Sequence, residues 1–146
     1  MKNFIDVFQE LLDENSLTIK SFARKINMHW SVLYAYKNNN YLPSLSTAVK
    51  IANYFNCSLN YLMGLDELEN KNLLKNFDIT KFYPRYNSLL KEENISHFTL
   101  SKKIKLNTSS LIYWKCGKVP KMDSLIKIAN YFDVSIDYLV GRSDRQ

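Results

Sequence analysis

Apolar residues recur along the chain at the three- and four-residue spacing that is typical of amphipathic helices. The clearest run stands near the start, where the spacing predicts a helix over residues 3–14. Its inner face would carry Phe4, Val7, Phe8, Leu11 and Leu12. The whole chain holds only three glycines and three prolines. This scarcity of turn residues favours packed helices over an all-β fold.

The second half of the chain repeats the first. Residues 50–55 recur letter for letter as residues 127–132, and ten of the fifteen positions in 50–64 and 127–141 are identical. Upstream the match is weaker and its offset changes by one. The extra residue of the first copy falls between Asn38 and Pro43, which indicates a loop, where a change of length costs little. The repeat predicts two copies of one folding unit.

Each copy divides into five short helices. Thr18 and Ser96 are candidate N-caps of the second helix, which ends at a tight turn marked by Asn27 or Lys105. Asparagine suits the positive φ of such a turn and lysine suits it poorly, so we expect strain at Lys105.

The third helix is expected over residues 29–38 and 107–116, with Leu33 and Tyr36, or Leu111 and Trp114, facing inward. The fourth helix follows a proline in each copy. The fifth is short, begins at a serine cap, and ends at a C-terminal glycine. The residues that mark these last two helices are Pro43, Pro120, Ser58, Ser135, Gly64 and Gly141.

The stretch between the copies carries Leu68, Leu73, Leu74 and Phe77, which predict a short helical linker. The sequence therefore predicts an all-α fold of two tandem five-helix domains, at residues 1–65 and 82–146, joined by a linker at 66–81. A domain of this size is marginally stable alone.

Charge and composition narrow the classes of function. The formal net charge is +6; residues 1–68 balance to zero, so the second half holds the whole excess. This is compatible with a polyanionic partner. Cys57 and Cys116 have no further cysteine or histidine at ligand spacing, so we expect neither a metal nor another cofactor. No signal peptide and no apolar run of membrane-spanning length is found, and the sequence predicts a cytoplasmic protein.

Residues 98–120, 125–129 and 134–141 resemble the phage-repressor (Cro/XRE-type) helix-turn-helix family. The first copy resembles it through residues 17–18, 22–23 and 26–28, through Leu33 and Tyr36, and through residues 43–45 and 58–64. The resemblance implies that the second and third helices form the motif and that the third lies in the major groove of double-stranded DNA. It thereby implies a transcription regulator, a repressor in the family's usual role, and not an enzyme. No catalytic constellation is found in the sequence.

Carried over by position, the resemblance implies base-facing residues in both copies. They are Trp30, Ser31, Val32 and Tyr34 in the first, and Thr108, Ser109, Ser110 and Ile112 in the second, with Asn107 as a candidate amide contact. The residue that opens the second helix usually holds a phosphate. Here Ile19 cannot do so and His97 can, as a donor. Lysines around the second motif are expected to neutralise phosphates: Lys102, Lys103, Lys105, Lys115, Lys118 and Lys121.

The first copy departs from the family pattern because its base-facing surface is bulky and apolar. An exposed aromatic cluster is more often a protein interface than a DNA reader. The second copy is therefore the better candidate for reading DNA. Two alternatives stay open for the first: it reads DNA, or it docks a protein or a second copy of the chain. In the latter case the chain is an interaction module, such as an anti-repressor or an antitoxin-like partner.

Overall fold

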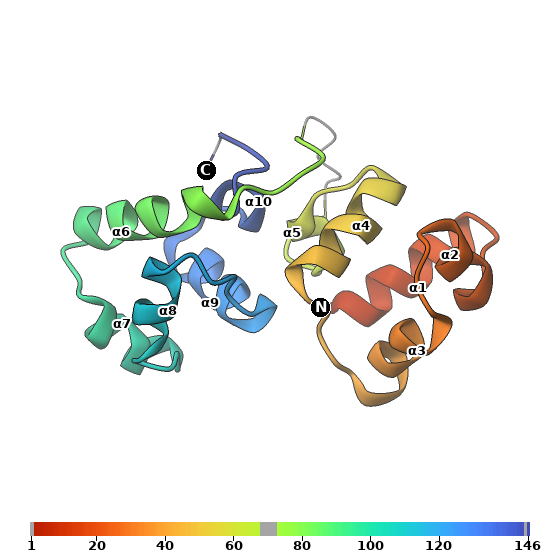
Figure 1. The fold of residues 1–146 in the computed structure, drawn as a ribbon, viewed down its shortest axis with the longest axis horizontal. Coiled ribbons are helices and arrows are strands. Elements are labelled where there is room, and N and C mark those ends of the chain that lie inside the picture. The colour runs from red at the N-terminus through yellow and green to blue at the C-terminus, as the bar shows by residue number, and fades with distance from the viewer. Residues whose placement is uncertain (1, 68–72, 145) are drawn as a thin grey trace. The chain divides into compact units, whose positions relative to one another are not determined.

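A computed structural model describes residues 2–67, 73–144 and 146 (Figure 1). The chain divides into two compact units, Met1–Lys71 and Asn72–Gln146. The described residues form helices, turns and irregular segments, with no strand. None of the described helices is long and apolar enough to cross a membrane.

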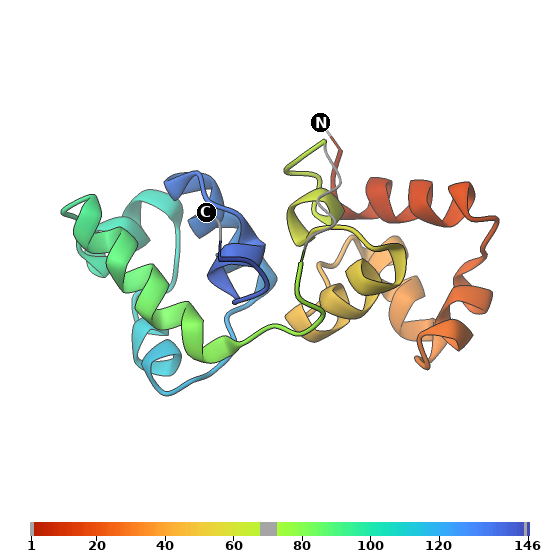
Figure 2. The same cartoon turned by 90° about the horizontal axis from the view of Figure 1, so that it is seen from above.

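The first unit consists of five helices whose starts are fixed by local hydrogen bonds. They are α1 (Phe4–Glu14), α2 (Ile19–Lys25), α3 (Trp30–Asn39), α4 (Leu45–Phe55) and α5 (Leu59–Leu62). A side chain at the residue before each helix accepts a hydrogen bond from a backbone N–H of the first turn. The N-caps at Thr18 and Ser58 are confirmed. Figures 1 and 2 show α2 and α3 side by side, as a helix-turn-helix requires.

Aromatic side chains fill the core of the first unit. The ring of Phe8 meets that of Phe22 edge to face, with centroids 5.5 Å apart, and the ring of Phe4 meets that of Tyr36 in the same way at 6.0 Å. All five apolar residues predicted for the inner face of the first helix are buried. Leu33 is fully buried, so α3 is held on this core by the face that was expected to point inward.

The second unit repeats this order. A 3-10 turn, η1 (Ile79–Lys81), leads into α6 (Phe82–Glu92), α7 (His97–Ile104), α8 (Ser110–Lys115), α9 (Met122–Phe132) and α10 (Ile136–Leu139). The predicted caps at Ser96 and Ser135 are confirmed. Trp114 is buried against Phe82 and Tyr86, with ring centroids 5.3 and 5.5 Å away. The side chain of Leu111 is only half-buried.

Gly64 and Gly141 close the two units in the same way. Both have a positive φ, of 77° and 81°. A Cβ at Gly64 would lie 2.2 Å from the carbonyl oxygen of Lys2, and one at Gly141 would lie 3.0 Å from that of Asp78. Each glycine therefore lets the start of its own unit pass close over the end of its last helix.

The prediction of a helical linker is wrong for the described residues of this stretch. Residues 65–67 and 73–78 are irregular, and only η1 is helical; Leu68 lies outside the described residues. The backbone N–H groups of Leu74 and Asp78 donate instead to the carbonyls of Arg142 and Val140, at 3.0 and 2.7 Å. These bonds to the end of the second unit replace the bonds within a helix. Leu74, which was expected on the apolar face of that helix, is 60% exposed.

Candidate nucleic-acid interface

The turn between the second and third helices has the same conformation in both units. Asn27 and Lys105 adopt the left-handed region, with φ of 56° and 60°. The next residue's N–H donates back to the second helix, from Met28 to Ala23 and from Leu106 to Ser101, each at 2.9 Å. The predicted turn is confirmed, and a lysine occupies a position that costs an ordinary side chain about 1 kcal/mol.

The third helix of the second unit begins later than predicted. A helix was predicted over residues 107–116, but it starts at Ser110. Asn107, Thr108 and Ser109 lie in the turn before it. The side-chain oxygen of Asn107 accepts hydrogen bonds from the N–H of Ser109 at 3.0 Å and from its hydroxyl at 2.7 Å. This local bonding competes with helical bonding, which delays the helix. The Asn107 oxygen is thus occupied within the turn.

The residues expected to meet DNA in the second unit lie together at the start of α8. Asn107, Thr108 and Ser109 are exposed and Ser110 is half-buried. Ile112 is 66% exposed. This end of the helix therefore offers hydroxyl groups and a branched apolar side chain. Such groups can hydrogen-bond to base edges and pack on a thymine methyl.

Lysines lie near the end of α7 and at the far end of α8. Lys102, Lys103, Lys115 and Lys118 are all exposed. Three of their ammonium groups lie over aromatic rings. Lys102 is 4.3 Å from the ring centre of Phe98, Lys118 is 5.1 Å from that of Tyr113, and Lys115 is 5.8 Å from that of Tyr83. Cation–π contacts of this kind hold the charges on the surface near the helix.

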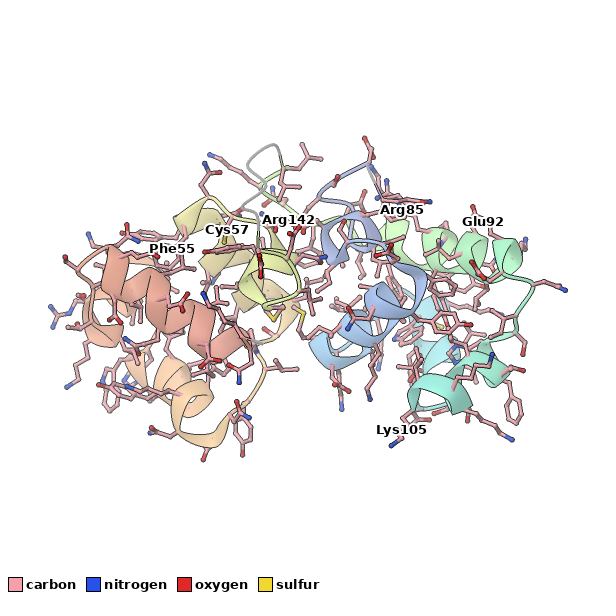
Figure 3. The ribbon with its side chains drawn as sticks, turned by 180° about the vertical axis from the view of Figure 1, so that it is seen from behind. Phe55, Cys57, Arg85, Glu92, Lys105 and Arg142 are labelled. Carbon is pink, nitrogen blue, oxygen red and sulfur yellow. The ribbon has the colours of Figure 1, made fainter. Side chains whose placement is uncertain are left out.

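A groove of about 410 Å³ runs between α8 and the start of α9. It is lined on one side by Ser109, Ser110 and Tyr113, and its further lining includes Lys105, Lys118 and Lys121. Figure 3 shows Lys105 projecting away from the ribbon beside α7. Tyr113, which is 52% exposed, did not stand out in the sequence, since its counterpart in the first copy is Ala35.

His97 is not placed to hold a phosphate, which corrects the sequence prediction. It is 7% exposed. Its Nδ1 lies 2.6 Å from the hydroxyl of Tyr86 and its Nε2 lies 3.2 Å from that of Ser101. Burial lowers the pKa of His97 because it disfavours the charged ring, although backbone groups of Thr108 and Asn107 oppose the shift. His97 is therefore a core residue that links α6 to α7.

The corresponding face of the first unit is aromatic. Trp30 is 43% exposed and Val32 is 40% exposed. The ring of Trp30 stacks on His29 at 5.4 Å and meets Tyr34 edge to face at 5.3 Å. The ammonium of Lys20 lies 5.1 Å from the ring centre of Trp30. Exposed Ser31 bonds locally, since its hydroxyl lies 2.6 Å from Nδ1 of His29.

The charge of each unit is divided between its helices. Residues 15–65 hold five basic and no acidic residues, and residues 94–122 hold six basic and none acidic. The acidic residues of the first copy lie in α1 and at positions 66 and 67. The neutral total of the first half thus conceals a basic motif. A sum of charge over each half of the chain hides this basic stretch.

Residues 8–62 match a family model described as helix-turn-helix. No curated protein and no solved structure matches the chain. The match spans α2 to α5 and most of α1, and it does not extend into the second unit. Residues 8–62 are thus similar to a Cro/C1-type helix-turn-helix domain, and this match supports a DNA-binding transcription regulator.

Proposed function

We propose that this chain is a sequence-specific, double-stranded DNA-binding regulator built from two repressor-like helix-turn-helix domains, at residues 1–65 and 82–146. α3 and α8 are the recognition helices, and the second domain is the main reader. The observation that carries the proposal is the exposed hydroxyl cluster of Thr108 and Ser109 within residues 94–122, a stretch that holds six basic and no acidic residues. No cofactor takes part.

The two kinds of side chain have different roles. Lysine ammonium groups pair with phosphates whatever the base sequence, so they supply affinity and salt dependence. The hydroxyls of Thr108 and Ser109 and the methyl groups of Ile112 reach base edges, so they supply sequence preference. Each good base contact contributes about 1–3 kcal/mol of discrimination. Because the contacts are short side chains, the preference is expected to be modest.

Selection of bound sequences from a random DNA pool tests this assignment. The wild-type chain is expected to enrich a motif. A chain with Thr108→Ala and Ser109→Ala is expected to lose preference at two or three positions and to keep its affinity for random DNA. Ser88→Ala is the matched control, since Ser88 is an exposed hydroxyl on α6. An unchanged motif in the double variant would remove these residues from the reading surface.

A second candidate function rests on the first unit. The exposed Trp30 and Val32 form an apolar surface of the kind that protein interfaces use. In this candidate the first unit holds a protein partner or a second copy of the chain, as an anti-repressor or an antitoxin-like protein does. The ammonium of Lys20 on α2 lies over the Trp30 ring, and a positive charge at this surface favours DNA instead. The DNA affinity and the self-association of a Trp30→Ala variant distinguish these two candidate functions.

A further inference from the structure

A buried polar cluster distinguishes the second unit from the first. It consists of Tyr86 on α6 and of His97 and Ser101 on α7. The repeat aligns these residues with apolar ones that are also buried in the first unit: Phe8, Ile19 and Ala23. A buried polar group costs free energy unless it is hydrogen-bonded, and a bonded network holds its members in one arrangement. The cluster therefore indicates that the second unit requires a fixed geometry at this place.

The hydrogen bonds of the cluster identify the tautomer of the histidine ring. The hydroxyl of Ser101 donates to the carbonyl oxygen of His97 at 2.7 Å, so its oxygen accepts from the ring nitrogen Nε2, 3.2 Å away. The proton of the neutral ring is therefore assigned to Nε2. Nδ1 then carries a lone pair, which accepts the hydroxyl of Tyr86 at 2.6 Å. The neutral ring uses both of its nitrogens, one as a donor and one as an acceptor.

The ring of His97 also lies against the segment that carries the proposed base contacts. Its centroid is 5.6 Å from that of Trp114 on α8, and His97 lines one cavity together with Leu111. Backbone groups of Thr108 and Asn107 act to raise the pKa of His97, which is the effect of carbonyl oxygens beside a ring N–H. His97 therefore lies where α6, α7 and the turn before α8 meet.

The first unit shows what the chain does without this cluster. The same left-handed turn forms there, with the same backbone bond after it. Helix α3 begins at Trp30, the counterpart of Thr108, whereas α8 begins only at Ser110. The side chain of Asn107 bonds on the exposed side of the later turn, and His97 lies on its buried side. The polar cluster thus accompanies an open turn, and an apolar core accompanies a helical one.

We propose that His97 is a positioning residue of the DNA reader: its neutral ring holds the turn before α8 in the conformation that presents Thr108 and Ser109 to base edges. This inference rests on the proposed function, because it concerns how the same residues read DNA. A proton on His97 adds an N–H at Nδ1, where the hydroxyl of Tyr86 donates in the neutral form. That hydroxyl must then turn its own proton away from the ring, inside the core, and the turn is held less firmly. Sequence preference falls as the ring gains a proton, and the phosphate contacts of the lysines remain.

Few charged groups surround the ring. The titratable side chains that face it are Tyr86 and, across the cavity that it lines, Tyr83, Lys91 and Lys115. No carboxylate belongs to this set among the described residues. On α9, the carboxylate of Asp123 pairs with Lys127 at 2.9 Å. Burial lowers the pKa of His97 below its ordinary value, so the ring is neutral at about pH 7 and gains a proton only in acid.

Nuclear magnetic resonance of the full chain without DNA tests the coupling between the ring and the turn. Between about pH 7.5 and about pH 5, the amide signals of Thr108 and Ser109 are expected to shift with the same midpoint as the ring signals of His97. In a His97→Gln variant these amide signals are expected to lose this shift. Amide signals that stay fixed while the ring titrates would overturn the proposal.

The ratio of the affinities for selected DNA and for random DNA tests the consequence for reading. Tyr86→Phe removes the hydroxyl that orients the ring and keeps the aromatic core. It is expected to lower this ratio about five-fold, the equivalent of one base contact, with the affinity for random DNA unchanged. Tyr131→Phe, the same change on an exposed ring of α9, is the matched control. The wild-type ratio is expected to fall toward acid, and the ratio of the His97→Gln variant is expected to stay constant.

The two proposals can fail separately. Ser101→Ala, a smaller change beside the other ring nitrogen, is expected to act in the same direction as Tyr86→Phe, and circular dichroism checks that both variants fold. A wild-type chain that enriches a motif, and whose preference survives both variants and acid pH, would overturn the positioning role and leave DNA reading intact. A wild-type chain that prefers no sequence would contradict the proposed function, and coupled amide signals would then still support the hold of His97 on the turn.

Discussion

Acid is expected to destabilise the second unit through His97. The pKa of this histidine is lowered by burial, so the folded unit favours the neutral ring. Its ordinary value, about 6.5, applies in the unfolded chain. Below that pH the unfolded chain binds a proton that the folded unit does not bind. Stability is therefore complete above about pH 6.5 and falls as the pH drops through that value.

The size of the effect is bounded by one proton. A single group changes the free energy of unfolding by at most about 1.4 kcal/mol per pH unit. If His97 stays neutral in the folded unit, the loss between pH 7 and pH 5.5 is at most about 1.2 kcal/mol. Burial also raises the pKa of the neighbouring Tyr86, so that its hydroxyl stays neutral throughout this window.

Urea unfolding at several pH values measures this contribution. Fluorescence of Trp114, whose ring centre lies 5.6 Å from that of His97, reports on the second unit in a Trp30→Phe background. The matched control is His97→Gln, which keeps a hydrogen-bonding side chain and cannot titrate. The difference between the two proteins in the free energy of unfolding should shrink toward acid. An identical pH dependence in both proteins would refute the role given to His97.

Three further outcomes are expected. Replacing the three exposed lysines Lys102, Lys103 and Lys118 by alanine should weaken binding evenly across DNA sequences. If each lysine contacts one phosphate, the triple variant should also reduce the slope of log affinity against log salt concentration by about 2.7. An unchanged slope in a salt titration would exclude these contacts. Trp30→Ala should reduce self-association, measured by sedimentation, more than DNA affinity, because α8 is the main reader; a larger loss of DNA affinity would contradict the lesser part given to α3. Lys105→Gly should stabilise the second unit by up to about 1 kcal/mol in thermal unfolding, because it relieves the left-handed backbone; a lower melting temperature would show that no strain is held there.

The helices and their caps could be predicted because their causes are local. Thr18 and Ser96 cap helices through bonds to residues three positions away, and such spacing can be read from the sequence. The left-handed turn at Asn27 follows from the same kind of reasoning. The late start of α8 was missed because the oxygen of Asn107 bonds to Ser109, and a helical pattern does not reveal that competition.

The errors concern contacts between residues far apart in the chain. His97 was assigned to the surface because its partner Tyr86 lies eleven positions earlier on another helix. The linker was expected to be helical because nothing in the sequence shows that Leu74 and Asp78 bond to the end of the second unit. The ion pair between Arg85 and Asp144 was missed for the same reason, since the two residues are 59 positions apart.

Photo-crosslinking from α8 tests the central claim most directly. A photoreactive residue in place of exposed Ile112 places the probe on the outer face of α8, and one in place of exposed Glu92 at the end of α6 serves as the control. With DNA enriched by the wild-type chain, we predict crosslinks to bases in the major groove from position 112 and none from position 92. Equal crosslinking from both positions, or none from position 112, would contradict the placement of α8 in the groove.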